Sequence, residues 1–214
     1  MTDVSVKICG LSTPETVDAA ISAGADYIGL VFFPPSPRNV DRDLAAHLIE
    51  GAAGRIRTIG LFVNPTDDDL GAVLARANLD LIQLQGRESP ERVAEIGARF
   101  NKRTVKALPV SEAKDLQAAD AYEDVADFLM FDAKPPQGSD RPGGNAAAFD
   151  WTLLAGLSWK RPYFLAGGLT ADNVATAMRI SGARCVDTSS GVEERPGVKD
   201  PHRIRQFVSA AKAL

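Results

Sequence analysis

The sequence predicts a single-domain α/β protein of the (β/α)8 barrel class, covering residues 1–214, and three observations support this. Short β-rich runs alternate with amphipathic helical stretches along the chain, which implies parallel strands joined by crossover helices. The β-rich runs number eight, the strand count of such a barrel. With 214 residues shared among eight units, each unit has about 27 residues, close to the minimum for a strand, a helix and their connections.

Each predicted strand is followed by a stretch with helical periodicity. In chain order the predicted strands are 5–9, 27–32, 58–63, 81–85, 104–108, 128–132, 163–167 and 185–190. Helix starts are predicted where residues that cap helix N-termini occur, in some cases just before a proline. These residues are Ser12, Ser89, Ser111, Thr170 and Asp200. An open doubly wound sheet is the alternative, but no G-x-G-x-x-G motif follows the first strand.

Composition narrows the possible partners and the location of the protein. The net charge of -4 and the lack of a basic run argue against nucleic acid or an anionic membrane as the main partner. The first residues do not read as a signal peptide, and no apolar stretch approaches the roughly 18 residues of a membrane span, so we expect a cytoplasmic protein. The two cysteines and two histidines show no metal-ligand spacing, which predicts reduced thiols and no metal.

Period-two alternation gives each predicted strand one apolar face and one face with a polar group near its end. In the first strand Val6 and Ile8 share one face, and Lys7 and Cys9 share the other. Barrel enzymes build their active sites at the carboxyl ends of the strands, so late polar residues are predicted to surround the barrel mouth. They are Cys9, Gln85, Asp132 and Asp187, and Gln83 lies on the same face as Gln85.

Two long connections are further candidates for a binding site. Residues 33–40 form a proline-rich, stiff segment that carries Arg38, whose guanidinium could hold a carboxylate or phosphate by two parallel hydrogen bonds. Solvated surface arginine is the alternative. Residues 133–148 are rich in glycine and proline, and loops of this length are commonly binding loops or lids.

The loops after the seventh and eighth predicted strands together predict a phosphate site. Paired glycines let backbone amides approach a ligand closely, and serines add hydroxyl donors. In barrels these two loops frequently hold phosphate beside the N-terminus of a short extra helix. The residues concerned are Gly167, Gly168, Ser189, Ser190 and Gly191. Simple turns are the alternative for each glycine taken alone.

Asp132 and Cys9 are the groups most suited to proton transfer. Asp132 ends an apolar strand, where burial would raise the pKa of its carboxyl toward the range of a general acid. A loop-bracing aspartate is the alternative. Cys9 is either a small core residue or a reactive thiolate, and Lys7 on the same face is expected to lower the pKa of the thiol. Cys185 is interpreted as a core residue.

These residues resemble the phosphoribosylanthranilate isomerases, single-domain TIM barrels of tryptophan biosynthesis that carry out an Amadori rearrangement. The resemblance covers almost the whole chain. It rests on KICGL, GADYIGLVFFPPSPR, IGLFVN, LIQLQG, VKAL, FDAKPPQGSDRPGG, LAGGL and DTSSGVEERPGVKD. The first and last of these blocks are specific to the family.

The resemblance implies roles for individual residues. Cys9 would be the general base, Asp132 the general acid, and Arg38 the clamp for the anthranilate carboxylate. Further substrate contacts would come from Gln83 and Asp187. The phosphate would be held by Gly167, Gly168, Ser189, Ser190 and Gly191. The resemblance also implies a phosphosugar substrate, no cofactor, and a monomer or homodimer.

Three positions depart from the family pattern. Gln85 stands where the family usually has histidine, Ala146 where a third glycine is common, and Thr188 where valine is usual; the last change is expected to matter little. A related barrel isomerase of histidine biosynthesis is a rival, but it would carry a carboxylate at the position of Cys9. A non-catalytic phosphosugar-binding protein and a redox role for Cys9 are further alternatives.

Overall fold

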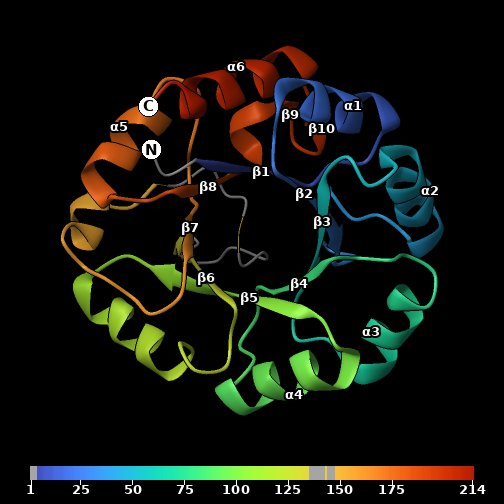
Figure 1. The fold of residues 1–214 in the computed structure, drawn as a ribbon, viewed down its shortest axis with the longest axis horizontal. Coiled ribbons are helices and arrows are strands. Elements are labelled where there is room, and N and C mark those ends of the chain that lie inside the picture. Colours follow the sequence, from blue (N-terminus) through green and yellow to red (C-terminus); the bar gives the residue numbers. More distant parts are fainter. Residues whose placement is uncertain (1–3, 135–142, 144–147) are drawn as a thin grey trace.

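The computed structural model describes residues 4–134, 143 and 148–214, and its centre is a closed barrel of parallel strands inside a ring of helices (Figure 1). The strands are β1 Ser5–Cys9, β2 Tyr27–Phe32, β3 Arg57–Phe62, β4 Leu81–Leu84, β5 Arg103–Val110, β6 Phe128–Ala133, β7 Tyr163–Leu165 and β8 Cys185–Thr188. Each strand pairs with the next, and β8 pairs with β1, which closes the barrel. The predicted fold class is confirmed, and the predicted strand ends agree to within two residues.

Helices cover the outside of the barrel and connect most of the strands (Figure 1). The α-helices are α1 Pro14–Ala23, α2 Arg42–Ala52, α3 Asp67–Leu74, α4 Pro90–Phe100, α5 Val174–Ser181 and α6 Pro201–Lys212. Shorter 3-10 helices are η1 Ala113–Ala121, η2 Trp151–Leu154 and η3 Ser190–Val192, and a hairpin of β9 Glu193–Arg195 and β10 Val198–Lys199 precedes α6. The helices expected after β5 and β6 are therefore 3-10 helices, η1 and η2. None of the helices in the described ranges is long and apolar enough to cross a bilayer.

The predicted helix starts are partly confirmed. Ser89 and Asp200 are N-caps, and the side chain of each accepts hydrogen bonds from the backbone of its own first turn. The other three predictions are wrong by one to three residues, because the N-caps are Thr13, Glu112 and Asn173 in place of Ser12, Ser111 and Thr170. At α1 the reason is Pro14, whose fixed φ suits the first helical position and makes the preceding residue the cap.

The core has two layers, which follow from the alternation of side chains along the strands. An outer layer packs between strands and helices and includes Val6 and Ile8, as the alternation predicts. An inner layer fills the barrel. It consists of Tyr27, Ile59, Leu81, Val105, Ala107, Phe128, Met130, Phe164 and Ala166, with the partly buried Cys185 packed against it. The inward polar residues near the strand ends, such as Cys9 and Asp187, are left to line the mouth of the barrel.

A buried ion pair braces the loop that follows β4. The Nζ atom of Lys106 lies 2.7 Å from Oε2 of Glu88, and both side chains are only 2% exposed. Lys106 also donates to the Gly86 carbonyl oxygen at 2.8 Å, while Oε1 of Glu88 accepts from the Asn64 amide at 2.7 Å. Burial lowers the pKa of the Lys106 ammonium, and the charge and hydrogen bond of Glu88 oppose this shift.

Replacement of Glu88 by glutamine is expected to lower the free energy of unfolding by about 3 kcal/mol, because it leaves a buried ammonium without its counter-charge. Urea denaturation of the parent and variant measures this difference. Asp43→Asn, which breaks the exposed contact between Arg76 and Asp43, is the control and should leave the midpoint unchanged. Equal midpoints for the two variants would show that the buried pair contributes no more than the exposed one.

Candidate active site

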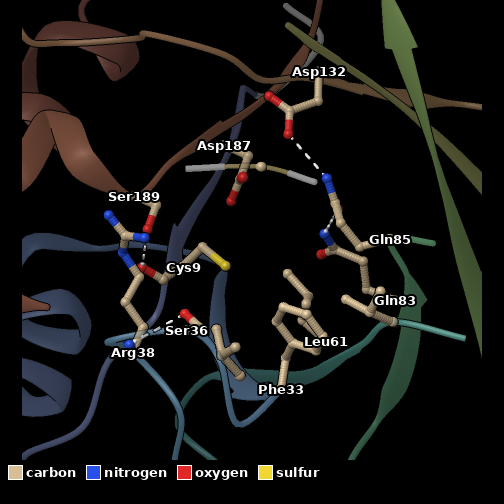
Figure 2. A pocket seen from close by; sticks show the side chains of 13 residues that line it. Cys9, Phe33, Ser36, Arg38, Leu61, Gln83, Gln85, Asp132, Asp187 and Ser189 are labelled. Atoms are coloured by element: carbon tan, nitrogen blue, oxygen red, sulfur yellow. Dashed lines mark hydrogen bonds between the residues drawn. The ribbon is translucent and has the colours of Figure 1, made fainter. Parts of the chain in front are cut away.

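A pocket lies at the carboxyl ends of the barrel strands, where barrel enzymes build their active sites (Figure 2). Its apolar walls come from Val31, Phe33, Leu61 and Val63, and Gly143 contributes backbone. Its polar residues are Cys9, Ser36, Arg38, Gln83, Gln85, Asp132, Asp187 and Ser189. The structure therefore brings the predicted catalytic and substrate-binding residues together in one place.

Cys9 ends β1 beside a buried ion pair that joins the first and last strands. Lys7, two residues earlier on the same face, donates from Nζ to Oδ1 of Asp187 at 2.8 Å, and Lys7 is fully buried. The two residues are direct neighbours in the register of β1 with β8. On the other side Gly29 of β2 makes room for the thiol, since a Cβ atom there would lie 2.8 Å from Sγ of Cys9.

Burial raises the pKa of the Cys9 thiol above its ordinary value of 9.0, and this effect is larger than the opposing charge of Lys7. The negative charge of Asp187 raises this pKa further, and Lys199 lowers it. The expectation that Lys7 would lower the pKa of the thiol overall is therefore wrong. The physical reason is that the ammonium is shared with Asp187, while Cys9 is largely buried and only 4% exposed.

Asp132, at the end of β6, is held in a form that can give up a proton near neutral pH. Burial raises the pKa of its carboxyl to about 7, with a further increase from the charge of Asp187. A hydrogen bond from Nε2 of Gln85 at 2.9 Å, the backbone amide of Ala133 and the charge of Lys7 act in the opposite direction. The predicted upward shift of this pKa is confirmed.

Arg38 is buried, and its guanidinium makes two parallel hydrogen bonds to a carboxylate of the protein. Its Nε and Nη2 atoms donate to Oε1 and Oε2 of Glu193 at 2.7 and 2.9 Å. Lys199 donates from Nζ to the same carboxylate at 2.7 Å and to Oγ of Ser189 at 3.0 Å. The paired hydrogen bonds predicted for Arg38 with a ligand are thus made here with Glu193.

Sequence reasoning missed Glu193 and Lys199, which hold Arg38 and Ser189 in place. Both residues lie on the β9–β10 hairpin, and Gly197 in its turn has a φ of +82°. The sequence does contain a signal for this hairpin, because the dipeptide Pro196-Gly197 is typical of a tight turn.

The two loops predicted to bind phosphate contact each other beside the pocket. Gly167 and Gly168 have positive φ values of +86° and +63°, which only glycine adopts readily. A Cβ atom at Gly191 would lie 1.9 Å from the carbonyl oxygen of Leu169, so a side chain at position 191 would collide with the other loop. Of the five predicted phosphate residues, Ser189 lines the pocket itself.

Thr188, the last residue of β8, makes a hydrogen bond to the loop after β7. Its Oγ1 donates to the carbonyl oxygen of Leu169 at 2.8 Å, and the side chain is buried. Valine has the same shape but could not make this bond. The expectation that threonine at this position matters little therefore underestimates its contribution to the contact.

Most of the loop expected over residues 133–148, including Ala146, lies outside the described residues. Gly143 is described and sits over the bond between Gln85 and Asp132: a Cβ atom there would lie 2.8 Å from Oδ2 of Asp132. In the part of the chain that the structure describes, no three His, Cys, Asp or Glu side chains gather as ligands for a metal ion.

Comparison with known proteins identifies the family. Residues 6–210 match the family described as N-(5'phosphoribosyl)anthranilate (PRA) isomerase. The chain is 56% identical over 209 residues to the N-(5'-phosphoribosyl)anthranilate isomerase of Paramagnetospirillum magneticum, covering 98% of this chain and 97% of the relative. The relative of the same name in Rhodospirillum rubrum is 51% identical over 217 residues, covering 99% of both chains.

Solved structures agree with the sequence comparison. The crystal structure of phosphoribosyl anthranilate isomerase from Thermotoga maritima superposes with a TM-score of 0.88 at 32% identity, covering 99% of this chain and 100% of that one. A phosphoribosyl anthranilate isomerase solved in complex with reduced 1-(o-carboxyphenylamino)-1-deoxyribulose 5-phosphate superposes with a TM-score of 0.84 at 30% identity, with the same coverage. The chain therefore belongs to the N-(5'-phosphoribosyl)anthranilate isomerase family.

Proposed function

We propose that the chain converts N-(5-phosphoribosyl)anthranilate to 1-(2-carboxyphenylamino)-1-deoxyribulose 5-phosphate in tryptophan biosynthesis, with Cys9 as general base and Asp132 as general acid. The observation that carries this proposal is that a thiol from β1 and a carboxyl from β6 line one pocket at the carboxyl ends of the strands (Figure 2). The family and the relative that binds a reduced form of this product support the choice of substrate.

The reaction needs a proton donor at the ribose ring oxygen, which is bonded to C1, and a base at the neighbouring carbon, C2. Asp132 protonates the ribose ring oxygen, the C1–O bond breaks, and the lone pair of the anthranilate nitrogen forms the C1=N bond of an iminium. Cys9, as a thiolate, then removes the proton from C2, and the electrons of that C–H bond form an enolamine and neutralise the nitrogen. Tautomerisation to the ketone protonates C1 and releases the proton of the C2 hydroxyl. No atom is gained or lost, as an isomerisation requires.

The charged groups around the pocket suit the two ends of the substrate. Arg38 lines the pocket in a cluster with Glu193 and Lys199, and its guanidinium suits the anthranilate carboxylate. Asp187 faces the pocket and can accept a hydrogen bond from a ribose hydroxyl. The phosphate is held by the loops after β7 and β8, through Gly167, Gly168, Ser189, Ser190 and Gly191.

Steady-state turnover of phosphoribosylanthranilate by the purified chain, in buffer containing a chelator, tests the proposed function. Product formation is followed by chromatography, and the aminoaldose substrate of histidine biosynthesis is the comparison. We expect turnover of the anthranilate compound and little of the other. Tight binding of a reduced product analogue without turnover of either compound would instead identify a binding protein.

In the pH dependence of kcat/KM we expect the general acid, Asp132, to have the lower pKa and the general base, Cys9, the higher pKa, which is the reverse of the usual order. The active form has Asp132 protonated and Cys9 ionised, yet the pKa of Asp132 is about 7 and the pKa of the thiol is raised above 9.0. Below pH 7 the carboxyl is protonated and the thiolate fraction grows with pH, so kcat/KM rises. Between the two pKa values the gain of thiolate is cancelled by the loss of protonated carboxyl, and above the pKa of the thiol the rate falls.

Rate measurements over roughly pH 5 to 10, combined with a direct titration of the thiol by its absorbance, check this order. The lower limb should belong to Asp132 and the upper limb to Cys9. A thiol that titrates on the lower limb would contradict the assignment and would mean that the charge of Lys7 outweighs burial at Cys9.

A further inference from the structure

Gln83 of β4, Gln85 just after the end of β4 and Asp132 of β6 form a chain of hydrogen bonds inside the pocket (Figure 2). Nε2 of Gln83 donates to Oε1 of Gln85 at 2.7 Å, and Nε2 of Gln85 donates to Oδ2 of Asp132 at 2.9 Å. The exposed fraction is 1% for Gln83 and 9% for each of the other two residues. The backbone amide of Gln85 still bonds to the Phe62 carbonyl oxygen of β3, so the alternation of β4 continues one residue past its end and both carboxamides face the pocket.

The direction of this chain is set by the carboxylate at its end. An ionised carboxylate only accepts hydrogen bonds, so Gln85 presents its Nε2 atom and turns its oxygen toward Gln83. Gln83 must then donate, and its own Oε1 is left without a hydrogen-bond partner among the described residues. Its remaining polar contact is a weak one, from Nε2 to the sulfur of Met130 at 3.4 Å.

The reversed chain would suit only a protonated Asp132. It would turn the oxygen of Gln85 toward Asp132 and leave the N–H groups of Gln83 buried without a carboxamide acceptor. Unpaired buried N–H groups are rarer than unpaired carbonyl oxygens in native proteins. The hydrogen bonds of the chain therefore all point toward Asp132, and the unpartnered oxygen of Gln83 lies at the other end.

We propose that Gln83 is a positioning residue that acts on Asp132 through Gln85: the two carboxamides form a one-way chain that stabilises the carboxylate left on Asp132 after it has given up its proton. This inference rests on the proposed role of Asp132 as general acid. It gives Gln83 a role that acts through Gln85, in addition to the direct substrate contact that the family resemblance implies.

The other charged groups that act on Asp132 do not provide this stabilisation by themselves. Asp187 on β8 opposes a negative charge on Asp132, and Lys7 on β1, which favours it, is already bonded to Asp187. Lys106 on β5, the strand next to β6, is paired with Glu88 instead. The donor nitrogen of Gln85 and the backbone amide of Ala133 are the hydrogen bonds that favour the ionised form.

The test is a titration of the Asp132 carboxyl by infrared spectroscopy in the intact protein without substrate. Its C=O band is identified by its loss in Asp132→Asn and is followed against pH in the parent, Gln85→Met, Gln83→Met and the double variant. Methionine matches glutamine in length and removes the donor. Met130→Leu is the control, because it alters packing against Gln83 and leaves both carboxamides in place.

We expect the midpoint to move upward by about one pH unit in Gln85→Met, and by less in Gln83→Met, where Gln85 keeps its nitrogen but is free to turn. The double variant should match Gln85→Met alone, since Gln83 acts only through Gln85. At pH 6, where Asp132 is protonated in each protein, kcat should fall about tenfold in Gln85→Met with little change in KM. Met130→Leu should match the parent.

An unchanged midpoint in Gln83→Met, or shifts that add in the double variant, would overturn the proposal, because either result means that Gln83 does not act through Gln85. The titration does not depend on turnover. If the parent fails to convert phosphoribosylanthranilate, the proposed function fails, while the midpoints still decide whether the carboxamide chain controls Asp132.

Discussion

Replacement of Cys9 by alanine is expected to lower kcat by about 1,000-fold, because the variant has no group to remove the proton from C2 of the iminium. KM should change little, since the phosphate loops and the cluster around Arg38 remain. Alanine also fits the site, because the substitution only removes the Sγ atom for which Gly29 leaves room. Steady-state kinetics with phosphoribosylanthranilate measure the effect, and binding of the reduced product analogue confirms an intact pocket.

Cys185→Ala is the matched control for Cys9→Ala. Cys185 begins β8 and packs against the inner layer, while Cys9 ends β1 and lines the pocket. The control should keep the kcat of the parent. A loss of kcat in Cys9→Ala alone would then show that the reaction requires the thiol of Cys9 and not that of Cys185. Activity of Cys9→Ala within tenfold of the parent would show that another group is the base.

Replacement of Asp132 by asparagine is expected to lower kcat by a similar factor, about 1,000-fold, because the amide cannot protonate the ring oxygen. The side chain keeps its shape, and its oxygen can still accept from Nε2 of Gln85, so ligand binding should survive. The limb of the pH profile near 7 should disappear together with the activity, since that limb belongs to the Asp132 carboxyl. Kinetics across this pH range measure both effects.

Asp127→Asn is the control for Asp132→Asn, because Asp127 precedes β6 at the end of the strand away from the pocket. Its Oδ2 accepts from the backbone amide of Thr104 at 2.8 Å, a contact between neighbouring strands. This variant should change stability more than kcat. A pH limb near 7 that persists in Asp132→Asn would assign that limb to a different group and remove Asp132 from the mechanism.

The residues that could be placed from sequence are those whose position follows from local alternation. Lys7 and Cys9 face the barrel interior because side chains alternate along a strand, and Asp132 reaches the mouth because it comes late in its strand. Parallel strands around a barrel end on the same side, so late inward residues from distant segments meet without any knowledge of their contacts. These local rules were enough to predict the limits of the strands and to select Cys9 and Asp132 as candidates for proton transfer.

The residues that could not be placed are those whose environment depends on partners far along the chain. Glu193 lies 155 residues from Arg38, and their pairing exists only because β8 closes onto β1. The same closure places Asp187 beside Lys7, 180 residues away. The ammonium of Lys7 is therefore paired with a carboxylate, which weakens its effect on the pKa of the Cys9 thiol.

The sequence by itself determined the barrel class, the strands and the family, because alternation, spacing and motifs are properties of short segments. Only the tertiary structure decided the direction of the pKa shift at Cys9, the partner of Arg38 and the carboxamide chain that ends on Asp132. Those features depend on burial and on charges brought together across the barrel, and both arise only when the barrel closes.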